Sequence, residues 1–199
     1  LCRRRAQATI EAALPVASGR VGRALAEARA AMAGAGYPRR AYRLVAMGYA
    51  SPLPAGGAIR YPQWGWSRLR PGGCPLWNAD ADWALSEATP SIDAVLRHAA
   101  AAAGAEFLDL QHAFDGHQLC DRSARLAGPR GPSAETSEWF RRLAFAPGSL
   151  RESLHPNAYG QRAVGACLGF LYAAPPGDYA CRGTPGRSYV DGMRLLPLG

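Results

Sequence analysis

Residues 44–49 of the chain read LVAMGY, a short apolar run that is typical of a β-strand buried on both faces. Residues 106–110, EFLDL, repeat this pattern. Each run follows a segment with helical spacing of apolar residues, 16–33 before the first and 80–103 before the second, the latter interrupted near Pro90. Helix, short turn and buried strand, repeated twice, predict a parallel, layered α/β domain.

A long loop separates these two units. Residues 50–78 are rich in proline and glycine and contain Trp64, Trp66 and Trp77. A stretch of this length without regular structure is unusual inside a compact domain unless it is functional. We expect the three indoles either to line an acyl or sugar pocket as substrate-binding residues, or to pack beneath the loop.

Two further helices are expected in the second half of the chain. Residues 121–135 are polar and rich in glycine and proline, and they predict a surface loop. A short helix is expected around 137–143, and a longer one at 156–172 with Pro156 in its first turn. Beyond Pro175 the sequence again becomes rich in glycine and proline, which predicts a tail with a short hairpin near its Asp-Gly pair.

The composition describes a folded domain without a strongly charged binding face. The chain has 199 residues, of which 48% are hydrophobic and 19% charged, so a disordered or fibrous chain is excluded. Its 23 basic residues, all arginines, exceed its 15 acidic residues to give a net charge of +8. Because the arginines are scattered, we expect a solvated surface and no nucleic-acid partner. No apolar stretch is long enough for a membrane span.

The residues with the clearest catalytic pattern lie at 151–157, RESLHPN. His155 directly precedes a helix-opening proline, where the helix dipole disfavours the imidazolium form and leaves a ring that can accept a proton. Glu152 is placed to hold the other ring nitrogen, although a backbone carbonyl remains an alternative. This is the base and orienting half of a serine-hydrolase triad; the simpler interpretation is a capping histidine on a surface loop.

Metal binding is a weaker hypothesis. His112, Asp115, His117 and Cys120 are of ligand type, but their spacing matches no standard zinc signature. We therefore expect a structural loop fastened by the cysteine, and no metal or other cofactor.

Residues 152–163, ESLHPNAYGQRA, resemble the C-terminal signature block of SGNH/GDSL hydrolases. Residues 47–49, the loop at 73–75, Asp109 and residues 114–120 are similar to the corresponding parts of secreted actinobacterial esterases and lipases. The resemblance covers most of residues 40–170. It implies a three-layer α/β/α, flavodoxin-like fold with a parallel sheet. It also implies hydrolysis of lipid, acylglycerol or acetylated-sugar esters through an acyl-enzyme on serine.

The chain departs from this family because it lacks the Gly-Asp-Ser block and the Gly-x-Asn-Asp block. Its asparagines are Asn78 and Asn157, and Ser51, Ser67 and Ser149 lie in expected loops. We therefore expect a C-terminal portion of an SGNH hydrolase, inactive alone. The missing N-terminal segment would belong to the same protein or to a second chain. On this view residues 1–173 are part of the hydrolase domain and 174–199 a disulfide-fastened tail. The alternative is a non-catalytic binding or structural module that has lost its nucleophile.

Five cysteines leave one without a partner. The positions relative to the expected sheet and last helix predict the pairs Cys74–Cys120 and Cys167–Cys181, and hence a secreted protein. Cys2 is left over, and the resemblance implies a partner for it in the missing segment.

Overall fold

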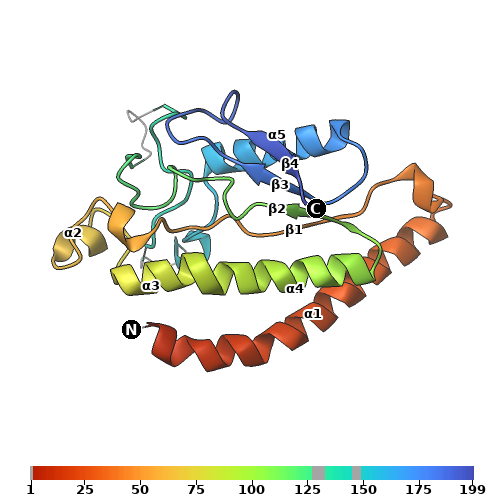
Figure 1. Ribbon diagram of the computed structural model, residues 1–199, viewed down its shortest axis with the longest axis horizontal. Helices are drawn as coiled ribbons and strands as arrows, with labels where there is room; N and C mark the ends of the chain where they lie inside the picture. The colour runs from red at the N-terminus through yellow and green to blue at the C-terminus, as the bar shows by residue number, and fades with distance from the viewer. Residues whose placement is uncertain (1, 127–132, 145–148) are drawn as a thin grey trace.

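The computed structural model describes residues 2–126, 133–144 and 149–199, which form four strands and five α-helices (Figure 1). The strands are β1 (Val45–Met47), β2 (Glu106–Asp109), β3 (Tyr179–Arg182) and β4 (Arg194–Pro197). The helices are α1 (Cys2–Gly34), α2 (Trp66–Leu69), α3 (Asn78–Trp83), α4 (Thr89–Ala102) and α5 (Ala158–Ala173). A π-helical turn at Ala84–Ala88 joins α3 to α4, and 3₁₀ turns lie at Arg39–Ala41, Gly56–Ala58 and Ser149–Glu152.

The four strands form one sheet in the order β1-β2-β3-β4. β1 and β2 are parallel, with Ala46 opposite Phe107, and β2 and β3 are also parallel. β4 is antiparallel to β3 and forms one edge of the sheet. The fold is therefore mixed α/β with a mostly parallel sheet, as the two helix–strand units predict.

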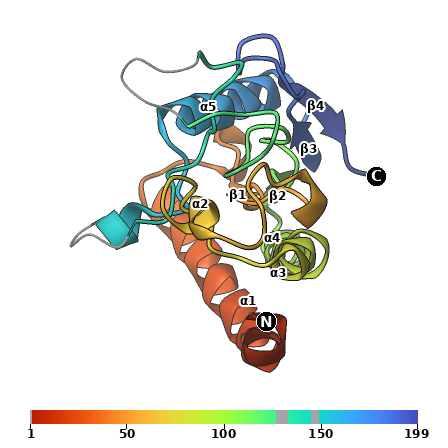
Figure 2. The ribbon, with the colours of Figure 1, turned by 90° about the vertical axis from the view of Figure 1, so that its left-hand side faces the viewer.

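Helices cover both faces of the sheet (Figures 1 and 2). On one face, Leu25 of α1 and Ala100 of α4 pack with Ala46 and Phe107. On the other face, α5 contributes apolar side chains to a larger core around Leu108. Because parallel strands are buried on both sides, they require the continuous apolar runs that mark them in the sequence.

Arg43 fastens the amino ends of the strands to the end of α5. Its Nε donates to Glu106 Oε1 at 2.8 Å, and its Nη1 donates to the backbone carbonyls of Leu171 (2.6 Å) and Ala174 (3.0 Å). Leu171 lies in the last turn of α5 and Ala174 directly after it, at the helix end where carbonyls need donor partners from outside the helix ladder. The guanidinium lowers the pKa of the Glu106 carboxyl. One arginine thus connects two adjacent strands with the helix that covers them.

Several expected boundaries differ from the structure. α1 is longer than the helix expected at 16–33 because it continues through Pro15, and it bends along its length (Figure 1). No break occurs at Pro90, because the helical backbone continues from α3 through the wider π-helical turn at Ala84–Ala88, which Pro90 closely follows, into α4. Pro156 lies before α5 rather than inside its first turn.

The prediction of a helix around 137–143 is wrong. Residues 137–140 are irregular and extended, with bridges from Ser137 to Arg125 and from Phe140 to Pro156. The apolar spacing that favours a helix here instead places Trp139 and Phe140 in the larger core beside Phe114. Residues 127–132 of the loop expected at 121–135 lie outside the described residues.

Residues 174–199 are not a tail but part of the sheet, because β3 pairs with β2 and β4 pairs with β3. A hairpin joins β3 to β4 and contains the Asp-Gly pair at 191–192, although its loop is longer than a tight turn. The sequence signal is weak because β3 buries only the small Ala180 and the disulfide-bonded Cys181, and β4 is mostly exposed.

Two disulfide bonds lie in the larger core, Cys74–Cys120 and Cys167–Cys181. They are the pairs expected from the sequence. The first closes the long loop after β1 onto the segment after β2, and the second joins α5 to β3. The side chain of Cys2 lies outside the described residues.

The free edge of β1 is held at one point by Asp93 of α4. In parallel pairing with β2, the alternate residues Val45 and Met47 direct their backbone groups away from β2, and no described residue bonds to them. The next outward N–H, that of Tyr49, donates to Asp93 Oδ1 at 3.0 Å. Burial, and secondarily the charge of Asp109, raise the pKa of Asp93 to about 6, although the Tyr49 N–H opposes the shift.

Replacing Asp93 by asparagine tests this buried carboxyl. Asparagine retains an acceptor for the Tyr49 N–H and carries no charge. A raised pKa in the folded state means that the wild type loses stability as the pH rises from about 4 to above 6. The difference in free energy of unfolding between Asp93→Asn and the wild type should therefore increase in favour of the variant by up to roughly 3 kcal/mol between pH 4 and pH 8.

Urea denaturation of both proteins across this pH range measures the difference. Asp82→Asn is the control, because Asp82 is exposed and also accepts a backbone N–H, from Gly56 at 2.8 Å. Parallel stability curves for the wild type and Asp93→Asn would show that the Asp93 carboxyl does not titrate in this range.

Candidate active site

The backbone around His155 is fixed by one neighbouring residue. Arg141 donates its N–H to the His155 carbonyl at 2.9 Å, and its own carbonyl accepts the Leu154 N–H at 2.9 Å. Leu154 has a φ of 61°, in the left-handed region that costs energy for a residue with a side chain. Strained backbone of this kind persists where the surroundings determine it, and it often lies beside functional residues.

The imidazole ring of His155 is exposed, and one of its nitrogens is engaged. Nδ1 lies 3.0 Å from the carbonyl oxygen of Ser153. A carbonyl only accepts hydrogen bonds, so Nδ1 carries the proton and Nε2 of the neutral ring carries the lone pair. No described group bonds to Nε2. The arrangement leaves a proton acceptor directed away from the backbone that holds it.

Glu152 does not orient this ring. Its Oε2 forms an ion pair with Arg141 Nη1, and both side chains are more than half exposed. The backbone carbonyl that the sequence leaves open as an alternative is the observed partner of His155. Arg141 binds the Glu152 carboxylate in place of the His155 ring. No sequence motif around Arg141 identifies it as the partner of Glu152.

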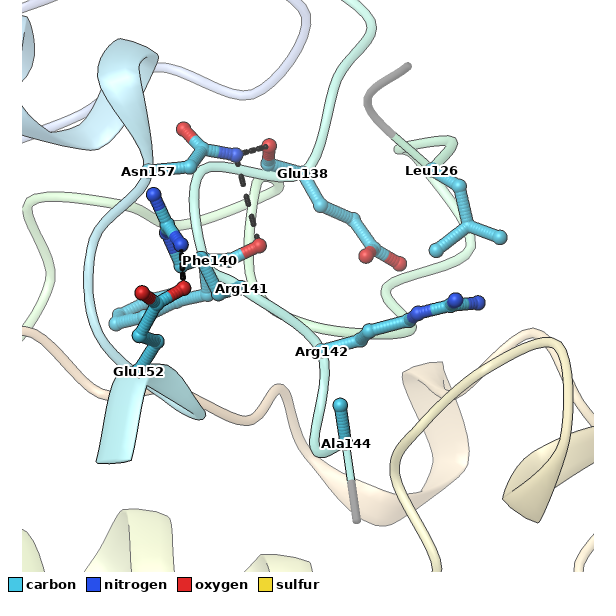
Figure 3. A pocket seen from close by; sticks show the side chains of 8 residues that line it. All are labelled: Leu126, Glu138, Phe140, Arg141, Arg142, Ala144, Glu152 and Asn157. Atoms are coloured by element: carbon cyan, nitrogen blue, oxygen red, sulfur yellow. Dashed lines mark hydrogen bonds and ion pairs between the residues drawn. The ribbon is translucent and has the colours of Figure 1, made fainter. Parts of the chain in front are cut away.

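Asn157 joins α5 to the extended segment before it. Its Oδ1 accepts the N–H groups of Tyr159 (2.9 Å) and Gly160 (3.2 Å) at the first turn of α5. Its Nδ2 donates to the Glu138 carbonyl at 2.7 Å, the shorter of the two bonds drawn from this amide in Figure 3. An asparagine directly before an apolar helix predicts a helix cap. No pattern in the neighbouring sequence predicts its bond to the Glu138 carbonyl.

A hollow of about 440 Å³ with charged side chains in its lining lies beside this junction (Figure 3). The ion pair of Arg141 with Glu152 forms one side, and the side chains of Glu138 and Arg142 lie across from it. The full lining is Leu126, Glu138, Phe140, Arg141, Arg142, Ala144, Glu152 and Asn157. His155 contributes no part of this lining, so the hollow is not formed around its ring.

Glu138 is a buried carboxylate that the sequence pattern does not single out. Its Oε1 accepts the backbone N–H of Cys120 at 2.8 Å and forms an ion pair with Arg60. Burial raises the pKa of Glu138, and the Arg60 guanidinium opposes the shift. The group ties the disulfide loop to the segment that carries Trp139, which is a structural role.

The expected loop around Cys120 contains no metal cluster among the described residues. His112 Nδ1 lies 2.9 Å from Asp115 Oδ2 at the surface. His117 is fully buried, stacked on Trp139, with its two ring nitrogens facing the carbonyls of Ser137 and Arg187. Burial lowers the pKa of His117.

Cys120 is in a disulfide bond, so its sulfur is not a thiolate ligand. The His112–Asp115 pair has the His–carboxylate contact that was expected of His155 and Glu152.

The three loop tryptophans separate into a pair and a single residue. The rings of Trp64 and Trp77 meet edge to face with centroids 4.6 Å apart, and both line a hollow. Trp66 begins α2 and is as exposed as Trp64, at 74%, but it does not line that hollow.

The loop serines have no nucleophile geometry in the described part of the chain. Ser51 is 1% exposed, and its hydroxyl donates to the Leu53 carbonyl at 3.0 Å. Ser67 lies within the short helix α2. The side chain of Ser149 lies outside the described residues.

Substitution of Asn157 tests the junction. Asn157→Ala removes the helix cap and leaves the Glu138 carbonyl without its donor, so we expect a loss of about 2 kcal/mol in the free energy of unfolding. Asn157→Ser retains a capping oxygen but is too short for the second bond, and about half the loss is expected. Urea denaturation measures both variants; a serine variant as stable as the wild type would show that the bond to Glu138 contributes nothing.

The tautomer of His155 is directly measurable. Long-range ¹H–¹⁵N spectra of the chain near pH 8 should show His155 with its proton on Nδ1. Glu152→Gln should leave this tautomer unchanged, because the Ser153 carbonyl holds the ring. A shift to the Nε2-protonated form in this variant would instead assign the orienting role to Glu152.

No protein-family model and no curated protein sequence matches the chain. Among solved structures it is similar to the extracellular lipase from Streptomyces rimosus, with 23% sequence identity and a TM-score of 0.43. The alignment covers 68% of this chain and 44% of the lipase, so the chain spans less than half of the lipase's length. Similarity at this level establishes neither a common family nor a common activity.

Proposed function

We propose that this chain supplies the catalytic histidine of a secreted, SGNH-type ester hydrolase. The observation that carries the proposal is the state of His155: an exposed ring, with Nδ1 donating to a carbonyl and Nε2 without a described partner. A neutral imidazole held in this tautomer is a general base for a hydroxyl group. The motif ESLHPN, in which His155 lies, supports the family assignment.

The chemistry requires a serine that the described residues do not provide. Nε2 of His155 takes the proton of the serine hydroxyl while Oγ attacks the ester carbonyl carbon. The tetrahedral intermediate expels the alcohol, which receives that proton, and leaves an acyl-enzyme. Water then attacks the acyl group with the same base, and release of the acid restores the serine. Esters of lipids, acylglycerols and acetylated sugars are the substrate classes that we propose, and no cofactor takes part.

The free edge of β1 offers a place for the serine-bearing segment. Val45 and Met47 have outward backbone groups without described partners, and Met47 is 42% exposed. A strand added in parallel would end at the same side of the sheet as β1. The loops that follow β1 and β2, including the one that leads to His155, also lie at this side. The segment belongs to the same protein or to a second chain.

The two disulfide bonds support a secreted location, because such bonds persist in oxidising compartments. Among the described residues, no helix is long and apolar enough to cross a membrane. The basic residues are scattered, so we propose a small ester as the ligand of this site rather than a nucleic acid.

A non-catalytic binding module is the second candidate. The observation that favours it is the hollow lined by Trp64 and Trp77, which is formed without any contribution from a nucleophile. This candidate predicts ligand binding without covalent labelling of any serine.

A fluorophosphonate probe distinguishes the two candidates. The 199-residue chain and the longest form encoded by its own gene are each treated with the probe and with p-nitrophenyl acetate. We expect labelling and turnover of the longer form, with the label on a serine outside this sequence. Turnover should fall by at least 10³-fold in His155→Ala, in line with loss of a triad member.

Glu152→Gln is the matched control, since its side chain pairs with Arg141 and not with the ring. It should retain activity within a few-fold of the wild type. Labelling of a serine within these 199 residues, or full turnover in His155→Ala, would contradict the proposal.

A further inference from the structure

Arg142 brings an unoccupied guanidinium to the hollow of about 440 Å³ beside Asn157. The residue is exposed, and among the described residues none accepts a hydrogen bond from its side chain or forms an ion pair with it. Its neighbour Arg141 is already paired with Glu152. A free guanidinium presents a planar fork of N–H donors, which matches the two oxygens of a carboxylate or phosphate group. The hollow therefore has an unused contact for an anion.

Glu138 brings an unused acceptor to the same hollow. Its Oε1 is engaged by the Cys120 N–H at 2.8 Å and by Arg60. No described group donates a hydrogen bond to Oε2, and this oxygen is not one of the fully buried polar atoms that lack a partner. It therefore keeps accessible surface, although the side chain is only 2% exposed. The carboxylate is directed toward the space that Arg142 and Leu126 also face (Figure 3).

One disulfide bond fixes the positions from which both side chains extend. The N–H that Glu138 accepts belongs to Cys120, which is bonded to Cys74. Gly73, directly before Cys74, lies against Arg142. Its carbonyl accepts the backbone N–H that follows Arg142 at 2.9 Å, and a β-carbon added to it would lie 2.6 Å from the Arg142 Cβ. The two groups are thus placed before any ligand arrives, which lowers the entropic cost of binding.

The charges around the hollow favour a ligand with a single negative charge. Glu138 and Glu152 both line it, and each is already paired with an arginine of its own. A phosphate dianion would place a second negative charge near these two carboxylates. A carboxylate brings one charge, which the guanidinium of Arg142 balances. The planar carboxylate is therefore the better match for this fork.

The open oxygen of Glu138 requires a hydrogen-bond donor on the ligand. An ammonium group would add a positive charge near Arg60 and Arg142, so a neutral N–H is the more suitable donor. Leu126 and Phe140 also line the hollow and offer an apolar surface. A carboxylate, a neighbouring N–H and an apolar side chain together describe an N-acylated α-amino acid.

We infer that this hollow binds an N-acylated amino acid with an apolar side chain, the chemistry that ends a peptide chain. The ligand carboxylate pairs with Arg142, and the ligand N–H donates to Glu138 Oε2. A fatty acid leaves that oxygen without a donor, and a neutral ester leaves Arg142 without an anion. The ligand therefore differs from the substrates of the proposed ester hydrolase. Binding is also independent of that chemistry, because His155 contributes no part of the lining.

Titration of the 199-residue chain with N-acetylleucine tests the inference, with ¹H–¹⁵N NMR of the backbone amides of Arg142 and Leu143 as the readout. We expect these amides to shift, and four other compounds each to bind at least about fivefold more weakly. N-acetylleucinamide lacks the carboxylate, and hexanoate lacks the N–H. N-acetyl-N-methylleucine carries a methyl group in place of that hydrogen, and inorganic phosphate has the charge without the donor or the apolar part.

The two sources of this ligand chemistry are separated by a longer ligand, an acetylated tripeptide that ends in leucine. Tighter binding of the tripeptide than of N-acetylleucine assigns the hollow to peptide carboxyl termini. Equal or weaker binding assigns it to free N-acyl amino acids. Either result supports the inference, because the carboxylate and its N–H are common to both.

Arg142→Gln should raise the Kd of N-acetylleucine at least about tenfold, because it removes the charged fork. Arg151→Gln is the matched control, since Arg151 is also an exposed arginine near this hollow in sequence but is not part of its lining. Its Kd should stay within about twofold of the wild type, and thermal melting should show both variants folded. No amide shift at about 20 mM N-acetylleucine, equal binding of N-acetylleucinamide, or an equal loss in both variants overturns the inference. Tighter binding of phosphate does so too.

Discussion

The amide of Asn157 is the contact on which the candidate active site depends. One side of this group caps α5, and the other bonds to the carbonyl of Glu138. A helix terminus and an extended segment are thereby fixed to one another within a single side chain. His155 lies two residues before this amide and is held against the same segment through Arg141. Movement of either element would displace the ring, so the position of the His155 imidazole follows from a hydrogen bond that it does not itself make.

The strands that could be predicted from the sequence are those whose own residues form an apolar run, which indicates burial. Residues 44–49 and 106–110 are apolar runs because Ala46 of β1 and Phe107 and Leu108 of β2 are buried in the two core clusters of the sheet. β3 and β4 have no comparable signature. The buried residues of β3 are the small Ala180 and the disulfide-bonded Cys181, and β4 is an edge strand with mostly exposed residues. Their strand conformation comes from pairing with β2, which a local pattern does not contain.

The candidate site likewise has one part that the sequence predicts and one part that it does not. The position of His155 before the last helix is local information, and the sequence supplies it. The partner of its ring is not local information. The sequence favours Glu152, because its side chain, three residues before His155, is long enough to reach the ring. Arg141 attracts that carboxylate instead, from a segment, 141–144, that has no regular structure in place of the expected helix. The pairing of Trp64 with Trp77, and the separation of Trp66 from both, likewise depends on how the loop closes around Arg68, whose guanidinium bonds to the carbonyls of Tyr61 and Leu76.

The two ends of the sheet are built from groups that respond differently to acid. At the amino end, Arg43 holds Glu106, and the lowered pKa of this carboxyl preserves their ion pair in mildly acidic surroundings. At the carboxyl end, the outward N–H of Tyr49 rests on a carboxyl that changes its charge near pH 6. Mild acidification therefore leaves the Arg43–Glu106 ion pair at the amino ends of the strands intact. It protonates Asp93 and so changes the hydrogen bond with the Tyr49 N–H, where the loop after β1 begins. A molecule that meets a changing pH would keep the amino ends of its strands constant while the end at which the loops begin adjusts.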